Sequence, residues 1–517
     1  MKTKLCFCTL VFALASLSSA NAQTKMPAPW HSSFVSIDDS GKLVYTPDEQ
    51  GNIIPDFSLV GYHHGDVAIP HHAATIVLKP LKGDNWAQIQ EAVDKVSAMA
   101  PDASGHRGTV LLSRGTYMVS RTISIAASGV VLSGEGSRID ETRLVATSRT
   151  RHSLIRVSGK GSVEEVKGTR VALTDSYVPV GAHSFNVSSA KGFKAGDRII
   201  LYRPGTKEWI HELKMDQIVE RQGTRQWTPQ EYNFSFEREI TKVSGKTIWI
   251  DNPVVLPLEA RFGGAEIFKY TYDGRICECG VTDLCIESEF EHYEDNEHGW
   301  IAVQLDDAEN CWVSNITSRY FGYACVSCER GAKNVTVRDC RSLHPKSVIT
   351  GGLRYSFNNC GQQNLFMDCQ AQEGRHDYVT GSQVCGPNVF YNCTASQSYA
   401  DIGPHHRWAM GTLFDNIVTD GQINVQDRGK MGSGHGWAGV TQVLWNCTAG
   451  SVVLQNPWTN GKNYSIGTKA EKKQGAHPDR MDGEWEGQGE TNVFPRSLFL
   501  AQLLSRHGVS LVDMNRN

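Results

Sequence analysis

Three short segments in the second half of the chain gather side chains that move protons and hold carboxylates. Each combines histidine with arginine, and two of them add tryptophan. Histidine exchanges protons near neutral pH, and arginine holds a carboxylate through two parallel hydrogen bonds. Tryptophan offers a flat apolar surface to a sugar ring. The segments are EGRHDYVTG (373–381), GPHHRWAMG (403–411) and QDRGKMGSGHGWAG (426–439).

Several of these side chains are separated by the same number of residues. The interval is 30 from Lys346 to His376, from His376 to His406, and from His405 to His435. A chain that coils with turns of about this length would stack them on one face, with about 4.8 Å between turns. The spacing therefore predicts one shared site built from neighbouring turns.

A site of this composition could remove a proton from a carbon beside a carboxylate and protonate a leaving oxygen. We assign the base to His406 or His405 and the acid to Tyr378. Arg375 and Arg407 would clamp the carboxylate. The other residues expected to exchange protons or bind substrate are His376, His435, Arg428, Lys430, Lys346, Trp408 and Trp437.

The elements around these segments form an imperfect repeat of short apolar runs. Each run ends in aspartate or asparagine followed by cysteine or asparagine, and successive ends lie 29, 24, 23 and 31 residues apart. This period is too short for a propeller blade, and the regular leucines of a leucine-rich repeat are absent. The runs are NVTVRDC (334–340), NLFMDC (364–369), NVFYNC (388–393), GTLFDN (411–416) and QVLWNC (442–447).

These runs predict the coils of a parallel β-helix, in which equivalent side chains stack from one turn to the next. Stacked asparagines are expected to hydrogen-bond along the stack, and stacked cysteines to fill the core as small apolar groups. We therefore expect a buried column rather than disulfide bonds at Cys340, Cys369, Cys393 and Cys447.

The N-terminal part adds an independent signal. DNWAQIQEAVDKVSA (84–98) has apolar residues at helical spacing, and GTVLLSRGTYMVSRTISIAASGVVLSGEG (108–136) alternates short strands with glycines. Both segments resemble the pectate-lyase-like superfamily of right-handed parallel β-helices, in which a helix of the IQxAI type caps the open end. With the repeats, the resemblance covers roughly residues 75–465. It implies an all-β, right-handed parallel β-helix with an N-terminal capping helix.

The remaining composition divides the chain into four parts and an insertion. Residues 1–22 are typical of a signal peptide, and residues 23–74 of an N-terminal extended segment. The β-helix is expected over 75–468, and a C-terminal loop and helix over 469–517. Longer alternating strands at about 170–260 predict an inserted antiparallel β subdomain, which could wall one side of a groove.

The two ends carry more detailed expectations. Lys2, Lys4 and a short apolar stretch before ANA (20–22) predict export to the periplasm or the extracellular space. The charged, glycine-rich residues 469–491 predict a mobile surface loop. PRSLFLAQLLSRHG (495–508) predicts an amphipathic helix that packs on the coil.

Composition excludes other partners. The 517 residues are 40% hydrophobic and 21% charged, with a net charge of −4. A general nucleic-acid binder would show a basic excess. No apolar run after the signal peptide is long enough to cross a membrane. We expect a monomer that neither binds nucleic acid nor inserts into a membrane.

Metal binding receives no firm assignment from the sequence. Cys325 and Cys328 could form half of a zinc site, but no second CxxC pair accompanies them. The stretch ESEFEHYEDNEHGW (287–300) could bind Ca²⁺, although its density of charge is also typical of a solvated loop. No cofactor is therefore expected with certainty, and Ca²⁺ stays possible.

The resemblance implies action on an acidic polysaccharide. We expect a secreted polysaccharide lyase that cleaves a uronic-acid-containing polymer by β-elimination; the polymer could be a pectin, an alginate-like chain or a glycosaminoglycan. One alternative is a β-helix glycoside hydrolase that uses Asp377, Asp401 and Asp427. GHG (434–436) is similar to a polygalacturonase motif, but that family's Asp-Asp pair and Arg-x-Lys are missing. The other alternative is a non-catalytic carbohydrate-binding β-helix.

Overall fold

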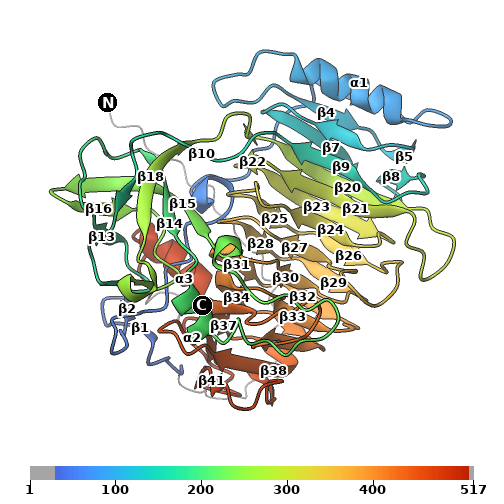
Figure 1. The fold of residues 1–517 in the computed structure, drawn as a ribbon. Coiled ribbons are helices and arrows are strands. Elements are labelled where there is room, and N and C mark those ends of the chain that lie inside the picture. Colours follow the sequence, from blue (N-terminus) through green and yellow to red (C-terminus); the bar gives the residue numbers. More distant parts are fainter. Residues whose placement is uncertain (1–28, 512–517) are drawn as a thin grey trace, which may run out of the picture.

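The computed structural model describes residues 29–511 (Figure 1). The chain forms a right-handed parallel β-helix in which three ladders of short strands run along the coil. The repeat predicted the parallel β-helix, and the family resemblance implied its right-handedness. The described residues place 29 strands in this one sheet. Signal-peptide residues 1–22 lie outside the described residues.

The first ladder contains every run of the sequence repeat. Each of its strands pairs in parallel with the equivalent strand of the next coil. It consists of β3 (Ile76–Leu78), β4 (Gly108–Leu112), β7 (Val130–Gly136), β20 (Gly280–Ser288), β23 (Trp312–Arg319), β25 (Thr336–Arg338), β28 (Leu365–Met367), β31 (Cys385–Tyr391), β34 (Ala409–Asp415), β37 (Gly439–Trp445), β39 (Tyr464–Ile466) and β42 (Glu484–Glu486).

The other two ladders follow in the same order along each coil. The second includes the ends of β20 and β23 and then β5 (Gly115–Val119), β8 (Thr142–Ala146), β26 (Arg341–Leu343), β29 (Gln370–Gln372), β32 (Thr394–Ser396), β35 (Val418–Thr419), β38 (Thr448–Asn456) and β40 (Lys469–Lys472). The third, which carries the histidines, consists of β6 (Ile123–Ile125), β9 (His152–Ser158), β21 (Gly299–Asp306), β24 (Ala324–Cys328), β27 (Phe357–Asn359), β30 (Tyr378–Thr380), β33 (Asp401–Pro404) and β36 (Gln422–Val425).

The polar residue of each repeat makes the corner between the first and second ladders. Asp368, Asn392, Asn416 and Asn446 have φ between 50° and 55°, a left-handed conformation that aspartate and asparagine tolerate better than most residues. Their side chains also bond from coil to coil: Asn392 Nδ2 donates to Asp368 Oδ1 (2.5 Å), and Asn446 Nδ2 donates to Asn416 Oδ1 (2.7 Å). The expected asparagine stacking is confirmed at these coils.

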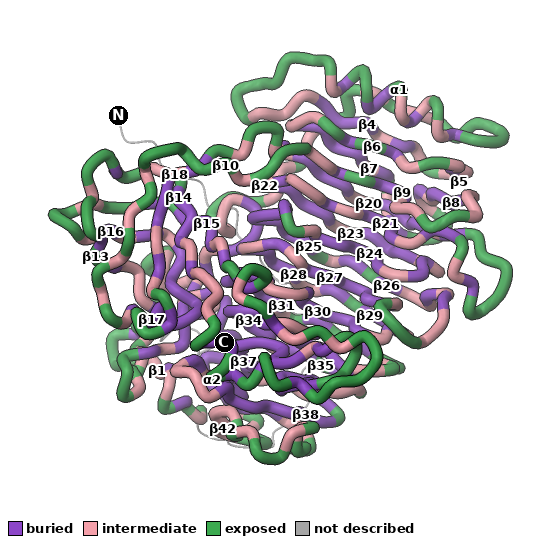
Figure 2. The backbone as a smooth tube through the Cα atoms, in the orientation of Figure 1, coloured by how far each residue is buried: buried purple, intermediate pink, exposed green. Residues whose placement is uncertain are grey.

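The residue after each corner points into the core, which explains the cysteines. Cys340, Cys369, Cys393 and Cys447 are fully buried in one apolar cluster with the strands around them. All twelve cysteines within residues 29–511 are unpaired. The predicted cysteine column is confirmed, and the buried strands of the coil stand out in Figure 2.

A helix closes one end of the coil. Helix α1 (Trp86–Ser97) lies across the first turns in Figure 1. Its apolar residues at helical spacing, Ile89, Ala92, Val93 and Val96, are buried against the core. The helix therefore covers apolar side chains that the open end of the coil would otherwise expose, as a capping helix should.

The insertion is an antiparallel sheet beside the coil, with central strand order β18-β14-β15-β16-β13. It begins before and ends after the predicted 170–260, because β10 pairs with β18 across its base. Its elements are β10 (Glu164–Glu165), β11 (Val171–Ala172), β12 (Tyr177–Val178), β13 (Ser184–Asn186), β14 (Arg198–Arg203), α2 (Lys207–Glu212), η2 (Pro229–Glu231), β15 (Phe234–Ser244), β16 (Thr247–Ile250), β17 (Leu258–Glu259), η3 (Ala260–Phe262) and β18 (Glu266–Thr271).

The two ends of the described chain cover the outside of the first ladder. Helix α3 (Leu498–Arg506) and residues near Phe57 pack on Leu413 and Trp445. The expectation of a loop over 469–491 is wrong, because β40 and β42 continue the ladders there as the last turn. The remaining elements are β1 (Val35–Ile37), β2 (Leu43–Tyr45), η1 (Tyr62–Gly65), β19 (Ile276–Cys277), β22 (Ala308–Glu309) and β41 (Met481–Asp482).

None of the helices in residues 29–511 has the length and hydropathy needed to cross a bilayer.

Candidate functional site

Four histidines from the three segments meet on the outside of the third ladder. His376 precedes β30, His405 and His406 follow β33, and His435 lies in the loop before β37. The ring of His405 lies 4.3 Å from that of His376 and 5.1 Å from each of the rings of His406 and His435. The rings of His406 and His435 are 4.9 Å apart. We call these four residues the histidine cluster.

Strand pairing brings the cluster together with a register that differs from the predicted one. Val379 of β30 pairs with Gly403 of β33, a turn of 24 residues rather than 30. Only the turn from β34 to β37 has the predicted length, with Ala409 opposite Gly439. The equal interval between His376 and His406 therefore does not reflect equivalent positions on the coil. Of the two, His405 is the closer neighbour of His376 in space.

The segment GPHHRWAMG turns sharply after β33. Arg407 and Trp408 both have left-handed backbone, with φ of 56° and 66°. The turn is held by the next coil, because the Arg407 N–H donates to the His435 carbonyl (3.1 Å) and the Trp408 N–H to the Trp437 carbonyl (2.9 Å). Non-glycine residues in this conformation are costly, and such strain is concentrated at functional sites.

One carboxylate organises the inner side of the cluster. His376 Nδ1 lies 2.8 Å from the backbone carbonyl oxygen of Asp401 and 2.9 Å from the side-chain Oδ1 of the same residue. The other carboxylate oxygen accepts from Asn424 Nδ2 (2.8 Å) and pairs with Arg428. Asp401 therefore orients the His376 ring, while Arg428 neutralises the Asp401 charge.

The histidines of the cluster are uncharged at neutral pH. Burial lowers the pKa of His405 to about 2, helped by the neighbouring imidazoles. Burial and the charge of Arg407 lower the pKa of His406 to about 4, and burial with His406 lowers that of His435 to about 3. The pKa of His376 is also well below its ordinary value, because of burial and then of Arg375 and Arg428. The rings are therefore free to accept a proton, but as weak bases, and a bound carboxylate beside them would raise their pKa and strengthen them.

Each ring in the cluster also keeps a nitrogen without a partner. Within residues 29–511, no hydrogen-bonding group reaches His376 Nε2 or the Nδ1 atoms of His405, His406 and His435. His376 and His405 are only 2% and 8% exposed. A buried polar atom without a partner costs about 1–3 kcal/mol. Four such atoms in one place are expected of a site that binds a ligand.

Cationic side chains surround the cluster. Arg375 is half-buried beside His376, and Arg407 Nη2 donates to Ser433. Burial lowers the pKa of Arg428 to about 10, which leaves its side chain charged. Lys430 is exposed and lies farther along the same loop. The arrangement offers positive charge next to neutral bases.

Three predicted roles are wrong, because the side chains point inward. Tyr378 is fully buried in the coil core, and its hydroxyl donates to the carbonyls of Cys369 and Thr394. It therefore has no access to substrate and cannot act as the acid. Trp408 and Trp437 are also fully buried, and both belong to the apolar core between the coil and the insertion. They cannot stack on a sugar.

Sequence reasoning missed a tyrosine that does reach the cluster. The ring of Tyr355 lies 4.9 Å from that of His376 and 5.5 Å from that of His405. Burial raises the pKa of Tyr355, so its hydroxyl keeps its proton at neutral pH. The sequence signal that could have identified Tyr355 is its position one coil before His376. Phe357 pairs with Tyr378, and Tyr355 and His376 each lie two residues before this pair, so they occupy equivalent positions.

The three aspartates of the hydrolase alternative do not form a catalytic set. Asp377 is buried and accepts from the hydroxyls of Ser356 (2.7 Å) and Ser398 (2.8 Å). Asp427 is fully buried and pairs with Arg480 at 2.8 Å. In the strand pairing, the residue opposite Asp401 is Gln422 and not Asp427. A hydrolase needs two carboxyl groups facing one cleft.

One set of residues has the geometry for a metal ion. His376, Asp401 and His405 place ligand atoms within 4.8 Å of one another, and no other such group occurs in residues 29–511. Two histidines and a carboxylate suit zinc or iron. However, Arg428 already neutralises the Asp401 charge. A metal ion would therefore have to compete with Arg428 for the Asp401 carboxylate.

The other two metal expectations find no support. The acidic stretch 287–300 is not among the sets of converging ligands in the described part of the chain. Its Asp295 is engaged by Arg149 (2.7 Å) and by two backbone N–H groups. Cys325 and Cys328 are buried in the coil core.

The insertion forms a wall beside the histidine cluster. The loop after α2 hydrogen-bonds to the loop that carries His435, because the Arg225 N–H donates to Ser433 (3.1 Å) and Arg221 Nη2 donates to Gly432 (2.6 Å). Trp209 of α2 packs against Trp408, with ring centroids 5.1 Å apart. The insertion thus limits access to one side of the cluster.

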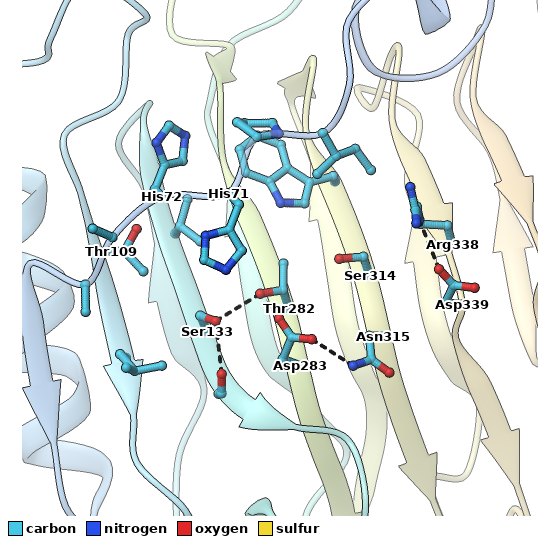
Figure 3. Close-up of a pocket in the computed structure, with 18 residues that line it drawn as sticks. His71, His72, Thr109, Ser133, Thr282, Asp283, Ser314, Asn315, Arg338 and Asp339 are labelled. Atoms are coloured by element: carbon cyan, nitrogen blue, oxygen red, sulfur yellow. Dashed lines mark hydrogen bonds and ion pairs between the residues drawn. The ribbon is translucent and has the colours of Figure 1, made fainter. Parts of the chain in front are cut away.

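A separate groove lies on the first ladder near the capped end (Figure 3). It encloses about 430 Å³. Ser133 and Thr282 on its floor are in register and joined by a hydrogen bond of 3.0 Å, and His71 lies above them. The polar floor suits a hydroxylated ligand. The groove lacks the buried, unpartnered imidazoles of the histidine cluster, so we place the chemistry at the cluster.

Comparison with known proteins finds only distant similarity. No protein-family model and no curated protein matches this chain. Among solved structures, the tailspike protein gp49 from Pseudomonas phage LKA1 is similar over 75% of this chain and 64% of its own, at 17% identity and a TM-score of 0.40. The chain thus spans less than two thirds of that protein.

Two further solved structures are enzymes by their names. An alginate lyase from Paenibacillus sp. str. FPU-7 is similar over 81% of this chain and 100% of its own, with 10% identity and a TM-score of 0.38. The A-module of the Azotobacter vinelandii mannuronan C-5 epimerase AlgE6 is similar over 79% and 91%, with 10% identity and a TM-score of 0.33. These likenesses are too distant to assign a family or an activity.

Proposed function

We propose that this chain is an exported, monomeric polysaccharide lyase of the pectate-lyase-like superfamily, acting on a uronic-acid-containing polymer by β-elimination. The observation that carries the proposal is the histidine cluster: neutral imidazoles with unpartnered nitrogens beside arginines, on the outside of a parallel β-helix. Neutral bases and carboxylate-binding cations are the groups that this reaction needs.

The reaction assigns one role to each group. His405 or His406 removes the C5 proton of the uronic acid, and the electron pair forms the C4–C5 double bond. The bond from C4 to the glycosidic oxygen breaks, and that oxygen takes a proton from the Tyr355 hydroxyl. Arg375 and Arg407 bind the carboxylate, on which negative charge grows as the proton leaves. Tyr355 replaces the buried Tyr378 as the proton donor.

The test follows the product. Elimination creates an unsaturated sugar that absorbs in the near ultraviolet, whereas hydrolysis does not. Incubating the protein with pectin, alginate and glycosaminoglycans, with and without a chelator, should raise this absorbance for at least one polymer. Because general base catalysis contributes about 10²–10⁴-fold, the combined His405→Ala, His406→Ala variant should lose at least that factor in kcat.

Matched variants separate the roles. Tyr355→Phe should lower kcat while KM changes little, since only the transferred proton is lost. The exposed His31 serves as the control, and His31→Ala should keep full activity. New reducing ends without absorbance would identify a hydrolase instead, and full activity of the double variant would exclude the histidine cluster as the base. Loss of activity on chelation would indicate that a metal ion acts in the reaction and would favour His376, Asp401 and His405 as its ligands.

A further inference from the structure

An exposed aromatic patch lies next to the histidine cluster, at the corner between the second and third ladders. It consists of Phe290, Tyr293, Tyr320 and Tyr399. Phe290 is 36% exposed, Tyr293 40% and Tyr399 48%. The hydroxyls of Tyr293 and Tyr399 are 3.0 Å apart, which holds the two exposed loops together. Contiguous apolar surface of this kind is costly in water and commonly marks a binding site.

Two cations lie beneath these rings without a carboxylate. Lys346 Nζ is 4.6 Å from the ring centroid of Tyr293, and 5.6 Å and 5.7 Å from those of Phe290 and Tyr320. The Arg354 guanidinium is fully buried, and it donates to the Ser347 carbonyl and to the Tyr293 hydroxyl (3.1 Å). Neither forms an ion pair with any residue from 29 to 511. Ring faces stabilise a cation, but they do not neutralise its charge.

Several carboxylates near the patch are paired, whereas Glu289 and Glu294, next to Phe290 and Tyr293, form no ion pair within residues 29–511. Glu373 pairs with His344 at 2.8 Å, and Glu291 pairs with Arg149 at 3.3 Å. Glu287 lies 3.3 Å from Arg319. Because neither Lys346 nor Arg354 has a carboxylate partner among residues 29–511, the carboxylate of an incoming ligand can pair with Lys346 beside the rings.

The patch and the histidine cluster share one stretch of backbone. The Arg354 carbonyl accepts the N–H groups of Arg375 (2.8 Å) and His376 (3.1 Å). The Tyr399 N–H donates to the Gly374 carbonyl at 2.9 Å. Suppose that one sugar of a polymer lies at the histidine cluster beside Arg375. The adjoining sugar of that polymer would then lie on the aromatic patch.

We propose that the aromatic patch is a subsite for an acidic sugar adjoining the one that is cleaved. The sugar carboxylate pairs with Lys346, and Tyr399 and Phe290 contact the ring. This inference rests on the proposed function for the position of the cleaved sugar. The recognition of an acidic saccharide rests on the patch itself.

The test measures binding rather than turnover. Acidic oligosaccharides from the panel above are titrated calorimetrically into the His405→Ala, His406→Ala protein, with a neutral oligosaccharide of equal length as the comparison. Lys346→Gln should weaken binding of the acidic oligosaccharide about tenfold, which corresponds to about 1.4 kcal/mol, since a charge-assisted hydrogen bond is lost. Tyr399→Ala should weaken it severalfold. Lys242, which lies over the ring of Trp249 (4.7 Å) in the insertion, supplies the control Lys242→Gln, which should leave affinity unchanged.

The outcomes separate the two proposals. Ultraviolet-absorbing product together with unchanged affinity and KM in Lys346→Gln and Tyr399→Ala overturns the subsite alone. Lysine-dependent binding of acidic oligosaccharides without such product overturns the lyase and leaves the subsite standing. If the double histidine variant does not fold, the same substitutions in the wild-type background are compared by KM. Equal loss of affinity for neutral and acidic oligosaccharides contradicts the role of Lys346.

Discussion

At the scale of single residues, the site depends on burying groups that would normally be charged or hydrated. His405 is 8% exposed and lies among three other imidazoles, with Arg375 nearby. Exclusion from solvent and nearby positive charge therefore both disfavour its protonation. The same surroundings raise the pKa of Tyr355 through burial. One environment thus keeps the His405 imidazole neutral and the Tyr355 hydroxyl protonated at neutral pH.

This environment predicts an acid-sensitive fold. Because the pKa of His405 is about 2 in the folded protein and about 6.5 when unfolded, the unfolded state binds the proton first as pH falls. The stabilising contribution is complete above pH 6.5 and is lost progressively below it. At pH 5 the loss from His405 should be about 2 kcal/mol.

Urea unfolding at pH 7.5 and pH 5 measures this effect. His405→Gln should reduce the difference in unfolding free energy between the two pH values. The exposed His31, which forms no ion pair within residues 29–511, gives the control, and His31→Gln should leave the difference as it is in wild type. An identical pH dependence in wild type and His405→Gln would show that His405 is not held neutral by the fold.

At the scale of elements, the insertion is fixed to the coil by a buried ionic network. Glu237 of β15 is 3% exposed and accepts two hydrogen bonds of 2.7 Å from Arg275. Lys333, from the coil, lies 3.7 Å away. Burial alone would raise the pKa of Glu237, but Arg275 and Lys333 outweigh it and hold that pKa well below its usual range. The network sets where the insertion stands relative to the histidine cluster.

Breaking this network should destabilise the whole protein. Glu237→Gln removes the main carboxylate of this buried network and leaves Arg275 and Lys333 to share Glu309, so we expect a loss of about 3 kcal/mol at pH 7. The Glu237 contribution is present above the unfolded pKa of about 4.5 and disappears as pH falls below it. The variant should therefore lose less stability than wild type on acidification. Glu164→Gln, at an exposed position of β10, is the control. A loss below 1 kcal/mol in denaturant unfolding would contradict the assignment.

At the scale of the whole molecule, the core is a stack of equivalent positions that runs the length of the coil. Cysteine recurs there because a small, weakly polar side chain fits beside the corner of each turn. Cys340, Cys369 and Cys393 each direct Sγ to backbone carbonyls rather than to another sulfur. The coil is therefore held by packing and strand pairing instead of covalent links.

This architecture predicts that reductant has no effect on stability. Thermal unfolding with and without dithiothreitol should give the same Tm. Thiol titration in denaturant without reductant should detect all twelve cysteines from Cys277 to Cys447. In the native protein, the half-buried Cys277 and Cys360 should react first. Fewer than twelve thiols in denaturant would reveal disulfides and contradict the buried column.

Local patterns in the sequence determined the repeated architecture. The Asp or Asn of each repeat is needed for a left-handed corner, and the next residue must be small and apolar, so both leave a signature at every turn. The helical spacing at 84–98 likewise predicted the helix, and the resemblance to the pectate-lyase-like superfamily implied that this helix caps the coil. The gathering of histidine and arginine in three segments also indicated which turns carry the candidate site.

The tertiary structure alone decided which side chains face outward within those turns. Turn lengths vary from 21 to 30 residues around the site, so equal intervals in sequence did not mark equivalent positions. In a strand, a shift of one residue exchanges the inner and outer faces. For that reason Tyr378 fell in the core while Tyr355 reached the histidines. Trp408 was buried because a distant insertion packs over it, which no local pattern records.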